Sequence, residues 1–261
     1  GIRGVHIQKG HHKFSSRPGL WVRGALVLIQ VFVAVVLTST AIGMQRQFHF
    51  LNETELGYEP SEMLLLERAH YLDQKAGDVT DQIKELDEVS DVSQLFHTPG
   101  DPVSVMSFHF AENRDRMFML SVYPVDSSFF ETIKTEIRAG DFQSEDSNSV
   151  VVNSQAASLL GGDGVVGEYL HTITRQSEKI VDLQITGVVE NIHHGSLKHS
   201  LRPAVYVPVE KGSVPSNILV RYKGEKRDEV VDQMEKIWNQ AGTDAPFSVI
   251  VMEDKLESFY Q

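Results

Sequence analysis

Residues 24–44 read GALVLIQVFVAVVLTSTAIGM, a run of 21 residues without a charged side chain. At 1.5 Å per residue, a helix of this length spans about 30 Å, the thickness of the hydrocarbon core of a bilayer. A buried helix of a soluble protein is usually shorter and carries a polar stripe. A signal peptide has a shorter apolar core and a small-residue cleavage site, whereas 23 residues precede this run. We therefore predict one transmembrane helix over residues 24–44.

Four polar residues interrupt this run: Gln30, Thr38, Ser39 and Thr40. The hydroxyl groups can bond back to the helix backbone or across to a neighbouring helix. The amide of Gln30 is costlier in lipid. We therefore expect Gln30 to face another membrane helix, with the three hydroxyl residues available for helix packing.

The charges are distributed unevenly around the run. Residues 1–46 hold six Lys/Arg and no Asp/Glu, which leaves 18 basic and 36 acidic residues for the remainder. The positive-inside rule places residues 1–23 in the cytoplasm as a basic segment and residues from about 47 onward outside. The outer part is acidic enough to repel nucleic acid, which is therefore an unlikely class of partner. Cysteine is absent, which excludes disulfides, thiol nucleophiles and cysteine-based zinc sites.

A short connecting segment, residues 45–60, follows the span. Phe48, Leu51 and Leu56 recur at roughly helical spacing, and Gly57 and Pro60 are expected to end the helix. This pattern predicts a stalk that transmits motion between the membrane and the outer part. An ordinary linker fits the same residues.

The outer domain, residues 61–261, begins and ends with similar strand–helix–strand patterns. In residues 61–98 we predict a strand at 63–68, a helix at 78–88 and a strand at 89–96. In residues 215–261 we predict a strand at 217–222, a helix at 226–240 and a strand at 247–252. The fold class is therefore α+β, with the two halves forming one split βαβ unit of the ferredoxin-like, porter type and both helices on one face.

The intervening residues 99–214 are predicted to form an inserted β-rich subdomain. Alternating apolar residues predict strands at 103–111, 117–125, 149–153, 180–192 and 204–209. Short helices are expected at 127–137 and 154–160, the first with Asp126 as its N-cap.

Few residues in the outer domain suggest chemistry. Gly162, Gly164 and Gly167 match the dinucleotide-binding pattern by letter, but a helical stretch precedes them and an extended one follows, so we predict a turn. The sequence has no P-loop, HExxH or GxSxG motif. His194, His199 and Glu190 are weak candidates for a zinc site. Adjacent residues of a strand point to opposite faces, so His193 and His194 cannot easily share a metal. We predict no catalytic residue and no bound cofactor.

Four segments, in order, resemble a known family. They are WVRGALVLIQVFVAVVLTSTAIGMQRQFHFLNETELGYEPSEMLLLE (21–67), SVVVNSQAASLLG (149–161), ITGVVENIHHGSLKHSLRPAVYV (185–207) and DEVVDQMEKIWNQAGTDAPFSVIVMEDKLESFYQ (228–261). They are similar to the start of the second half of FtsX/MacB-like ABC transporter permeases of Bacteroidetes-type bacteria. Ile192 stands where that family usually has an aromatic residue.

The resemblance implies a fragment of a permease of the bacterial inner membrane, with residues from about 47 onward in the periplasm. It implies a cytoplasmic ABC ATPase as partner, which binds and hydrolyses ATP, so that this chain holds no ATP itself. Further partners implied are other permease helices or a second permease copy, and a periplasmic or outer-membrane protein. The expected role is export or mechanotransmission without enzymatic activity. The residues also leave open an extracytoplasmic sensor domain of a signalling receptor, with a ligand pocket, and a membrane-tethered hydrolase.

Overall fold

The structure is a computed structural model that describes residues 18–53, 57–97, 103–110, 113–143, 146–173, 180–194, 201–210 and 212–258. The chain divides into two compact units, Gly1–Thr54 and Glu55–Gln261. Each unit is considered by itself below.

The first unit contains one long helix, α1 (Pro18–Glu53). Its 36 residues correspond to about 54 Å at 1.5 Å per residue. Within it, Trp21–Gly43 has a mean hydropathy of 2.4, and none of this stretch is buried. By length and composition it can cross a membrane. The helix continues beyond this apolar stretch to Glu53, as the spacing of apolar residues predicts for most of the stalk; residues 54–56 lie outside the described residues.

The second unit mixes short helices with many strands, which confirms the α+β class. Its helices are η1 (Ala69–Lys75), α2 (Ala76–Lys84), α3 (Phe129–Ile133), α4 (Ser154–Leu160), η2 (Asp163–Val165), α5 (Arg227–Gln240) and α6 (Met252–Ser258). Its strands are β1 (Met63–Leu66), β2 (Val89–Leu95), β3 (Ser104–Phe110), β4 (Asn113–Val125), β5 (Ile137–Gly140), β6 (Ser149–Asn153), β7 (Tyr169–Ile173), β8 (Ile180–Val189), β9 (Ala204–Pro208), β10 (Asn217–Tyr222) and β11 (Val249–Val251).

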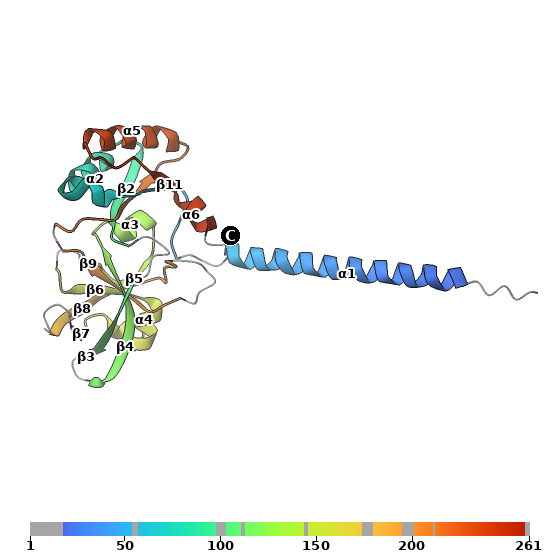
Figure 1. The fold of residues 1–261 in the computed structure, drawn as a ribbon. Coiled ribbons are helices and arrows are strands. Elements are labelled where there is room, and N and C mark those ends of the chain that lie inside the picture. The colour runs from blue at the N-terminus through green and yellow to red at the C-terminus, as the bar shows by residue number, and fades with distance from the viewer. Residues whose placement is uncertain are drawn as a thin grey trace, which may run out of the picture. The chain divides into compact units, whose positions relative to one another are not determined.

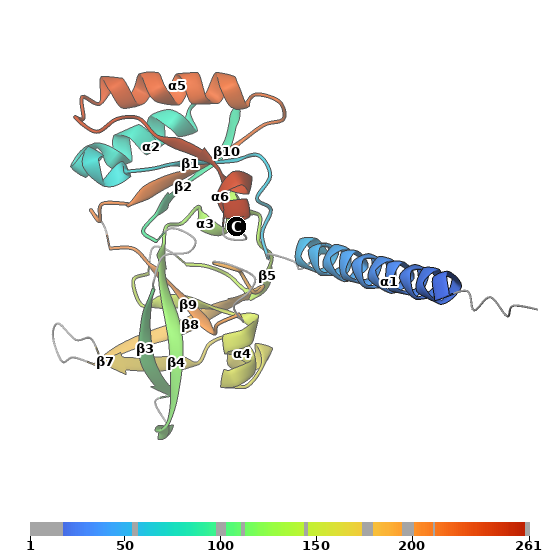
Figure 2. The same ribbon diagram turned by 45° about the vertical axis from the view of Figure 1, so that its right-hand side comes forward.

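Four strands from the two ends of the unit form one layer, which we call the terminal sheet. Its order is β11-β1-β10-β2, and every neighbouring pair is antiparallel. All side chains of β1 and β10 are buried, because both faces of this sheet are covered. On one face Leu64, Leu66, Ile218 and Val220 pack in the same cluster as residues of α2 and α5. The two helices lie next to each other over this face (Figures 1 and 2).

The middle of the chain forms a closed barrel. The strands pair in the order β4-β3-β7-β8-β6-β9, and β9 pairs back to β4. The pairs β4–β9 and β6–β8 are parallel, and the other four are antiparallel. All six strands contribute to one core: Phe108, Phe118, Leu120, Leu170, Leu183, Ile185, Val150, Val152 and Val205. Helix α4 adds Ala156, Ala157 and Leu160 to it. The sequence predicts five of these six strands and, at β7, only an extended stretch; it does not predict the closure.

Several predicted elements end earlier than expected, among them the helix predicted at 78–88, which ends at Lys84, and three others whose ends have a local cause. The helix predicted at 127–137 is only α3, because Lys134 adopts a left-handed conformation (φ 53°) that stops it, and Ile137 then starts β5. The strand predicted at 247–252 is only β11, since Met252 begins α6, whose first turn carries Glu253 and Asp254.

The strand predicted at 180–192 ends at Val189. Beyond it the backbone N–H of Glu190 donates to the carbonyl of Glu136 (3.0 Å), and the side chain of Asn191 accepts from the N–H of Gln155 (2.9 Å). Residues 190–194 therefore leave the ladder and run irregularly toward the terminal sheet.

Candidate functional site

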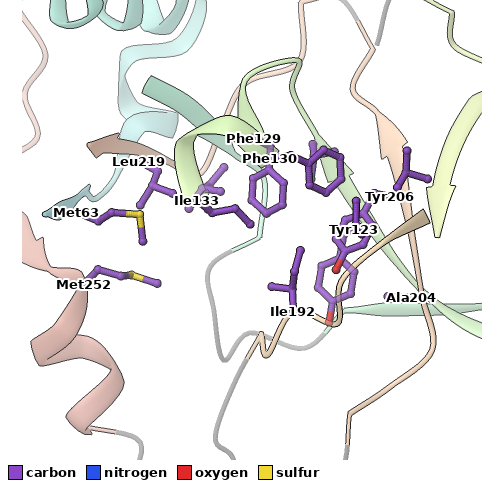
Figure 3. Close-up of a cluster of buried hydrophobic side chains, with 14 of the residues drawn as sticks. Met63, Tyr123, Phe129, Phe130, Ile133, Ile192, Ala204, Tyr206, Leu219 and Met252 are labelled. Carbon is purple, nitrogen blue, oxygen red and sulfur yellow. The ribbon is translucent and has the colours of Figure 1, made fainter. Parts of the chain in front are cut away.

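The terminal sheet and the barrel meet at a narrow junction. Their strands share a single ladder pair, Leu95 with Val125. A cluster of apolar and aromatic side chains fills the rest of the junction. Figure 3 shows it running from Leu219 of the sheet past Ile133 and Phe129 of α3 to Tyr123 and Tyr206 of the barrel. This cluster and the Leu95–Val125 pair connect the two parts at the junction.

Residues 57–62, which we call the lead-in segment, bring the chain to this junction. The backbone N–H of Glu59 donates to the carbonyl of Ile133 (3.0 Å), and the hydroxyl of Thr135 donates to the carbonyl of Gly57. Gly57 has a φ of 77°, and a Cβ placed there would lie 1.8 Å from the carbonyl oxygen of Asn191. Only glycine fits this close approach, so the lead-in segment is held against α3 and the 190–192 segment.

Arg221 of β10, an inner strand of the terminal sheet, also binds the lead-in segment. The residue is only 1% exposed. Its Nε donates to the carbonyl of Thr132 (2.6 Å), its Nη1 to that of Ser61 (2.8 Å) and its Nη2 to that of Glu59 (2.6 Å). One side chain thus ties strand β10, helix α3 and the lead-in segment together, using the fixed fork of donors that a guanidinium provides. We call this arrangement the Arg221 clasp.

The charge of Arg221 is retained despite its burial. Loss of water lowers the pKa of Arg221 from its usual value, while the carboxylates of Glu59, Asp91 and Glu62 oppose that shift. Glu59 also accepts from Nζ of Lys134 (2.8 Å) and from the hydroxyl of Ser61 (2.8 Å). These hydrogen bonds, that of Lys134 first, lower the pKa of Glu59.

The C-terminal end of the described chain also reaches the junction between the terminal sheet and the barrel. Strand β11 pairs with β1, and α6 follows it directly. Met252 of α6, Met63 of β1 and Tyr58 of the lead-in segment line one cavity of about 30 Å³. A single water molecule needs roughly 10–15 Å³ by this measure, so the cavity has room for one or two waters. Both ends of the domain therefore contact the junction.

On the barrel side of this cavity lies a half-buried histidine, His194. Nε2 of His194 and the hydroxyl of Tyr206 share a hydrogen bond of 2.9 Å, and the His194 ring stacks on Tyr123 with ring centres 3.8 Å apart. Loss of water lowers the pKa of His194 to about 3, with smaller contributions from His193 and His97. Burial likewise raises the pKa of Tyr206. Both groups are therefore neutral at physiological pH.

A buried carboxylate braces the same junction. Asp126, just after β4, accepts from the hydroxyl of Ser93 (2.8 Å) and from the backbone N–H groups of Gln94 (2.6 Å) and Ser128 (3.2 Å). Burial raises the pKa of Asp126, and these hydrogen bonds oppose the shift. The prediction that Asp126 is the N-cap is wrong, because α3 starts two residues later than expected and its N-cap is Ser128. Asp126 instead links the barrel to β2 and to the turn before α3.

The candidate zinc ligands His194 and Glu190 have separate partners in the structure. His194 bonds to Tyr206, and Glu190 lies 3.4 Å from Nε of Arg138. His199 lies outside the described residues, so the three-residue site stays a prediction. Across the described part of the chain, no group of three or more His, Asp or Glu side chains is placed to hold a metal ion. His193 and His194 both line the junction cavity. Residues 190–194 are not a strand, so the rule that adjacent strand residues face opposite ways does not apply to this pair.

The predicted turn at Gly162, Gly164 and Gly167 is confirmed, since it lies between α4 and β7 and contains η2.

In α1 the hydroxyls of Thr38 and Thr40 donate to the carbonyls of Ala34 and Val36 (2.8 Å each). The predicted packing of Gln30, Thr38, Ser39 and Thr40 against another helix stays a prediction.

Sequence reasoning did not identify Arg221 as a functional residue. The signal was present in Asn217–Tyr222, where one charged side chain interrupts an otherwise strand-like run, NILVRY. A charge within a fully buried strand requires hydrogen-bond partners. Here the partners are backbone carbonyls, and because every residue has one, the sequence does not identify them.

The comparisons with known proteins agree with this architecture. The family model of the MacB-like periplasmic core domain matches residues 26–237. No curated protein matches the sequence. The crystal structure of a domain of a presumed permease protein from Porphyromonas gingivalis is similar in fold. Its TM-score is 0.52 at 19% identity, over 74% of this chain and 92% of that one.

The extracellular domain of the noncanonic ABC-type transporter YknZ from Gram-positive bacteria matches with a TM-score of 0.46 at 16% identity, over 66% of this chain and 87% of that one. The family match covers the greater part of the chain and confirms the resemblance seen in the four sequence segments. The chain belongs to the family of the MacB-like periplasmic core domain, a component of ABC transporter permeases.

Proposed function

We propose that this chain is a permease element that couples ATP hydrolysis by a partner ATPase to movement of its periplasmic domain, for export or mechanotransmission. The observation that carries the proposal is the Arg221 clasp. The segment that follows the membrane helix is bound to both the sheet and α3 by one buried cation. A displacement arriving at residue 57 is therefore passed to the junction rather than absorbed by a loose linker.

We propose further that the terminal sheet is the split βαβ, ferredoxin-like unit expected from the sequence, with the barrel as its insertion. The strand order β11-β1-β10-β2 supports this, since each βαβ half places an antiparallel strand of the other half between its own two strands. Such interleaving makes the two ends of the domain a single layer.

The proposed topology follows the charges. The basic segment, residues 1–23, lies in the cytoplasm, the apolar stretch of α1 crosses the bacterial inner membrane, and residues from about 47 onward lie in the periplasm. In this arrangement ATP is bound by the cytoplasmic ATPase and not by this chain. Gln30, Thr38, Ser39 and Thr40 would contact other permease helices or a second permease copy, and the barrel would face a periplasmic or outer-membrane protein. No catalytic residue is assigned, and the role is not enzymatic.

Paired spin labels test the coupling, and the absence of cysteine makes this direct. Asp81→Cys on α2 and Leu159→Cys on α4 place one label on each side of the junction, at exposed positions. The permease is reconstituted in liposomes with its ATPase, and the label–label distance distribution is measured with and without ATP and vanadate. We expect the distribution to shift with nucleotide in the wild type and to stay fixed in Arg221→Met.

Arg227→Met is the matched control, because Arg227 is an exposed arginine whose Nε bonds only to the neighbouring Asp228 (3.1 Å) among the described residues. It should retain the shift. A nucleotide-dependent shift of equal size in Arg221→Met would disprove coupling through the clasp. No shift in the wild type would disprove the proposed movement itself.

A further inference from the structure

A row of polar side chains crosses the outer wall of the barrel, away from the junction. His109 on β3 is the register partner of His171 on β7, and His171 is the register partner of Asp182 on β8. Directly opposed residues of antiparallel strands point to the same face, with Cβ atoms about 4.5–5.5 Å apart. The three side chains therefore form one rung across three strands, which we call the histidine rung.

The hydrogen bond within the rung defines the state of His171. Its Nδ1 lies 2.8 Å from Oδ1 of Asp182. An ionised carboxylate can only accept, so Nδ1 carries the proton, and in the neutral ring Nε2 presents its lone pair. The side chain of His171 is 16% exposed, whereas that of Asp182 is 61% exposed. The carboxylate thus fixes the tautomer and orientation of a mostly buried imidazole.

Nε2 of His171 is buried, and no hydrogen-bond partner for it is found in the described structure. A buried polar atom without a hydrogen-bond partner destabilises the folded state and calls for an explanation. The nearest aromatic group is the His109 ring, stacked with its centre 5.6 Å from that of His171. The rung therefore holds one lone pair without a partner beside a second imidazole.

We propose that the histidine rung binds a divalent transition-metal ion of the borderline class, such as Zn²⁺ or Cu²⁺, through the two imidazoles, with water completing the coordination. A metal–nitrogen bond is about 2.0–2.1 Å, which places each ring centre roughly 3 Å from the ion. Ring centres up to about 6 Å apart can then share one ion, and a rotation of the half-buried His109 ring from its stacked position directs it there. Asp182 takes the place that a carboxylate commonly has behind a metal-bound histidine.

This site is distinct from the three-ligand sites considered above, since it uses two protein ligands. It also differs in place from His194, which lies at the junction. Because both ligands belong to the barrel, the bound ion would cross-link β3 to β7 and hold the barrel wall closed, independently of the Arg221 clasp.

Zn²⁺ titration of the full chain in detergent, followed by calorimetry, tests the proposal. We expect a binding event that disappears in His109→Ala and in His171→Ala and weakens about 10–100-fold in Asp182→Asn. Mg²⁺ should give no such event, because two imidazoles do not suit a hard cation. His109→Ala carries the test if His171→Ala fails to fold, since His109 is the less constrained ring.

Two control variants account for other histidines. His70→Ala removes an exposed histidine outside the barrel and should leave the event unchanged. His11→Ala with His12→Ala removes the adjacent pair near the N-terminus and should also leave the barrel event unchanged. Equal Zn²⁺ stoichiometry in wild type and His109→Ala, or no Zn²⁺ binding by the wild type, would overturn the proposal.

Hydrogen exchange gives a second measurement that does not depend on counting ions. A ligand bound only by the folded form, at 100 times its Kd, reduces the open population about 100-fold. We expect Zn²⁺ to slow exchange of the β3 and β7 amides by up to this factor, and to leave the amides of α5 unaffected. Slowing that persists in His109→Ala would show that the ion acts elsewhere.

Discussion

The terminal sheet and the barrel solve the problem of burying a sheet in opposite ways. The barrel closes on itself, and its core is built from its own six strands and α4. The terminal sheet stays open, and it depends on α2 and α5 for one face and on α3 and the junction cluster for the other. The barrel is therefore self-contained, whereas the sheet is sensitive to whatever acts on the lead-in segment. Four perturbations test this contrast.

The largest effect is expected from Arg221→Met. The substitution removes three hydrogen bonds of a side chain that is itself buried and leaves three carbonyls, that of the buried Thr132 among them, without their donor. We therefore expect a loss of about 3–5 kcal/mol in the free energy of unfolding. Trp238 of α5 is buried in the same cluster as the sheet residues and reports unfolding of the sheet layer by fluorescence in urea. Arg227→Met should cost less than about 0.5 kcal/mol. A loss below about 1 kcal/mol for Arg221→Met would mean that the clasp contributes little.

Truncation of one core at a time tests whether the two parts respond separately. Leu120→Ala in the barrel and Met234→Ala in α5 each remove a fully buried side chain and should cost about 2–5 kcal/mol. Hydrogen exchange should accelerate mainly in barrel amides for the first variant and mainly in sheet and α5 amides for the second. Equal acceleration everywhere in both variants would show a single cooperative unit instead.

Acid should weaken the junction through His194. Its pKa is about 3 in the folded protein, well below the usual 6.5, so the unfolded chain takes up the proton first as the pH falls. Stability contributed by the neutral ring is therefore lost as the pH drops below 6.5. At 1.36 kcal/mol per pH unit, this residue accounts for about 2–3 kcal/mol between pH 6.5 and 4.5.

Unfolding free energies measured over this pH range provide the check. They should vary less steeply in His194→Gln than in the wild type, while His70→Gln, at an exposed site, keeps the wild-type slope. A slope that is unchanged in His194→Gln would contradict the assignment.

The smallest effect is expected from Lys134→Met. Its ion pair with Glu59 lies at the surface, with each side chain about half exposed. Exposed pairs contribute about 0–1 kcal/mol and are screened by salt. We expect a loss below about 1 kcal/mol that disappears at 1 M NaCl. A larger, salt-independent loss would show that the outer side of the lead-in segment matters as much as the buried clasp.

The sequence predicts an element well where the spacing of its apolar residues matches the side chains that the fold buries. The strands at 149–153 and 217–222 and the helix at 154–160 have the predicted bounds, because apolar runs and the Asn153 cap define them locally. Closure of the barrel could not be predicted in this way. It depends on the parallel pairing of β4 with β9, strands about eighty residues apart, which no local pattern encodes.

The candidate site was harder to predict for a related reason. The Arg221 clasp consists of one side chain and three backbone carbonyls, so only its donor appears as a letter in the sequence. The cavity-lining role of His193 was missed because the strand before it was extended too far, and the chain leaves the ladder at Glu190 through long-range hydrogen bonds. Family resemblance identified the chain as a component of ABC transporter permeases, which neither composition nor spacing could indicate.

The pairing of β11 with β1 has a mechanical consequence. Leu64 opposes Val251, so the lead-in segment and α6 leave from the same end of this strand pair. Tension that separates the two ends would open the pair one hydrogen bond at a time, like a zipper, which requires little force. The Arg221 clasp moves the point of loading from β1 to the neighbouring strand β10, inside the sheet. A force-spectroscopy experiment would then record a stiff response that ends abruptly when the guanidinium releases its three carbonyls.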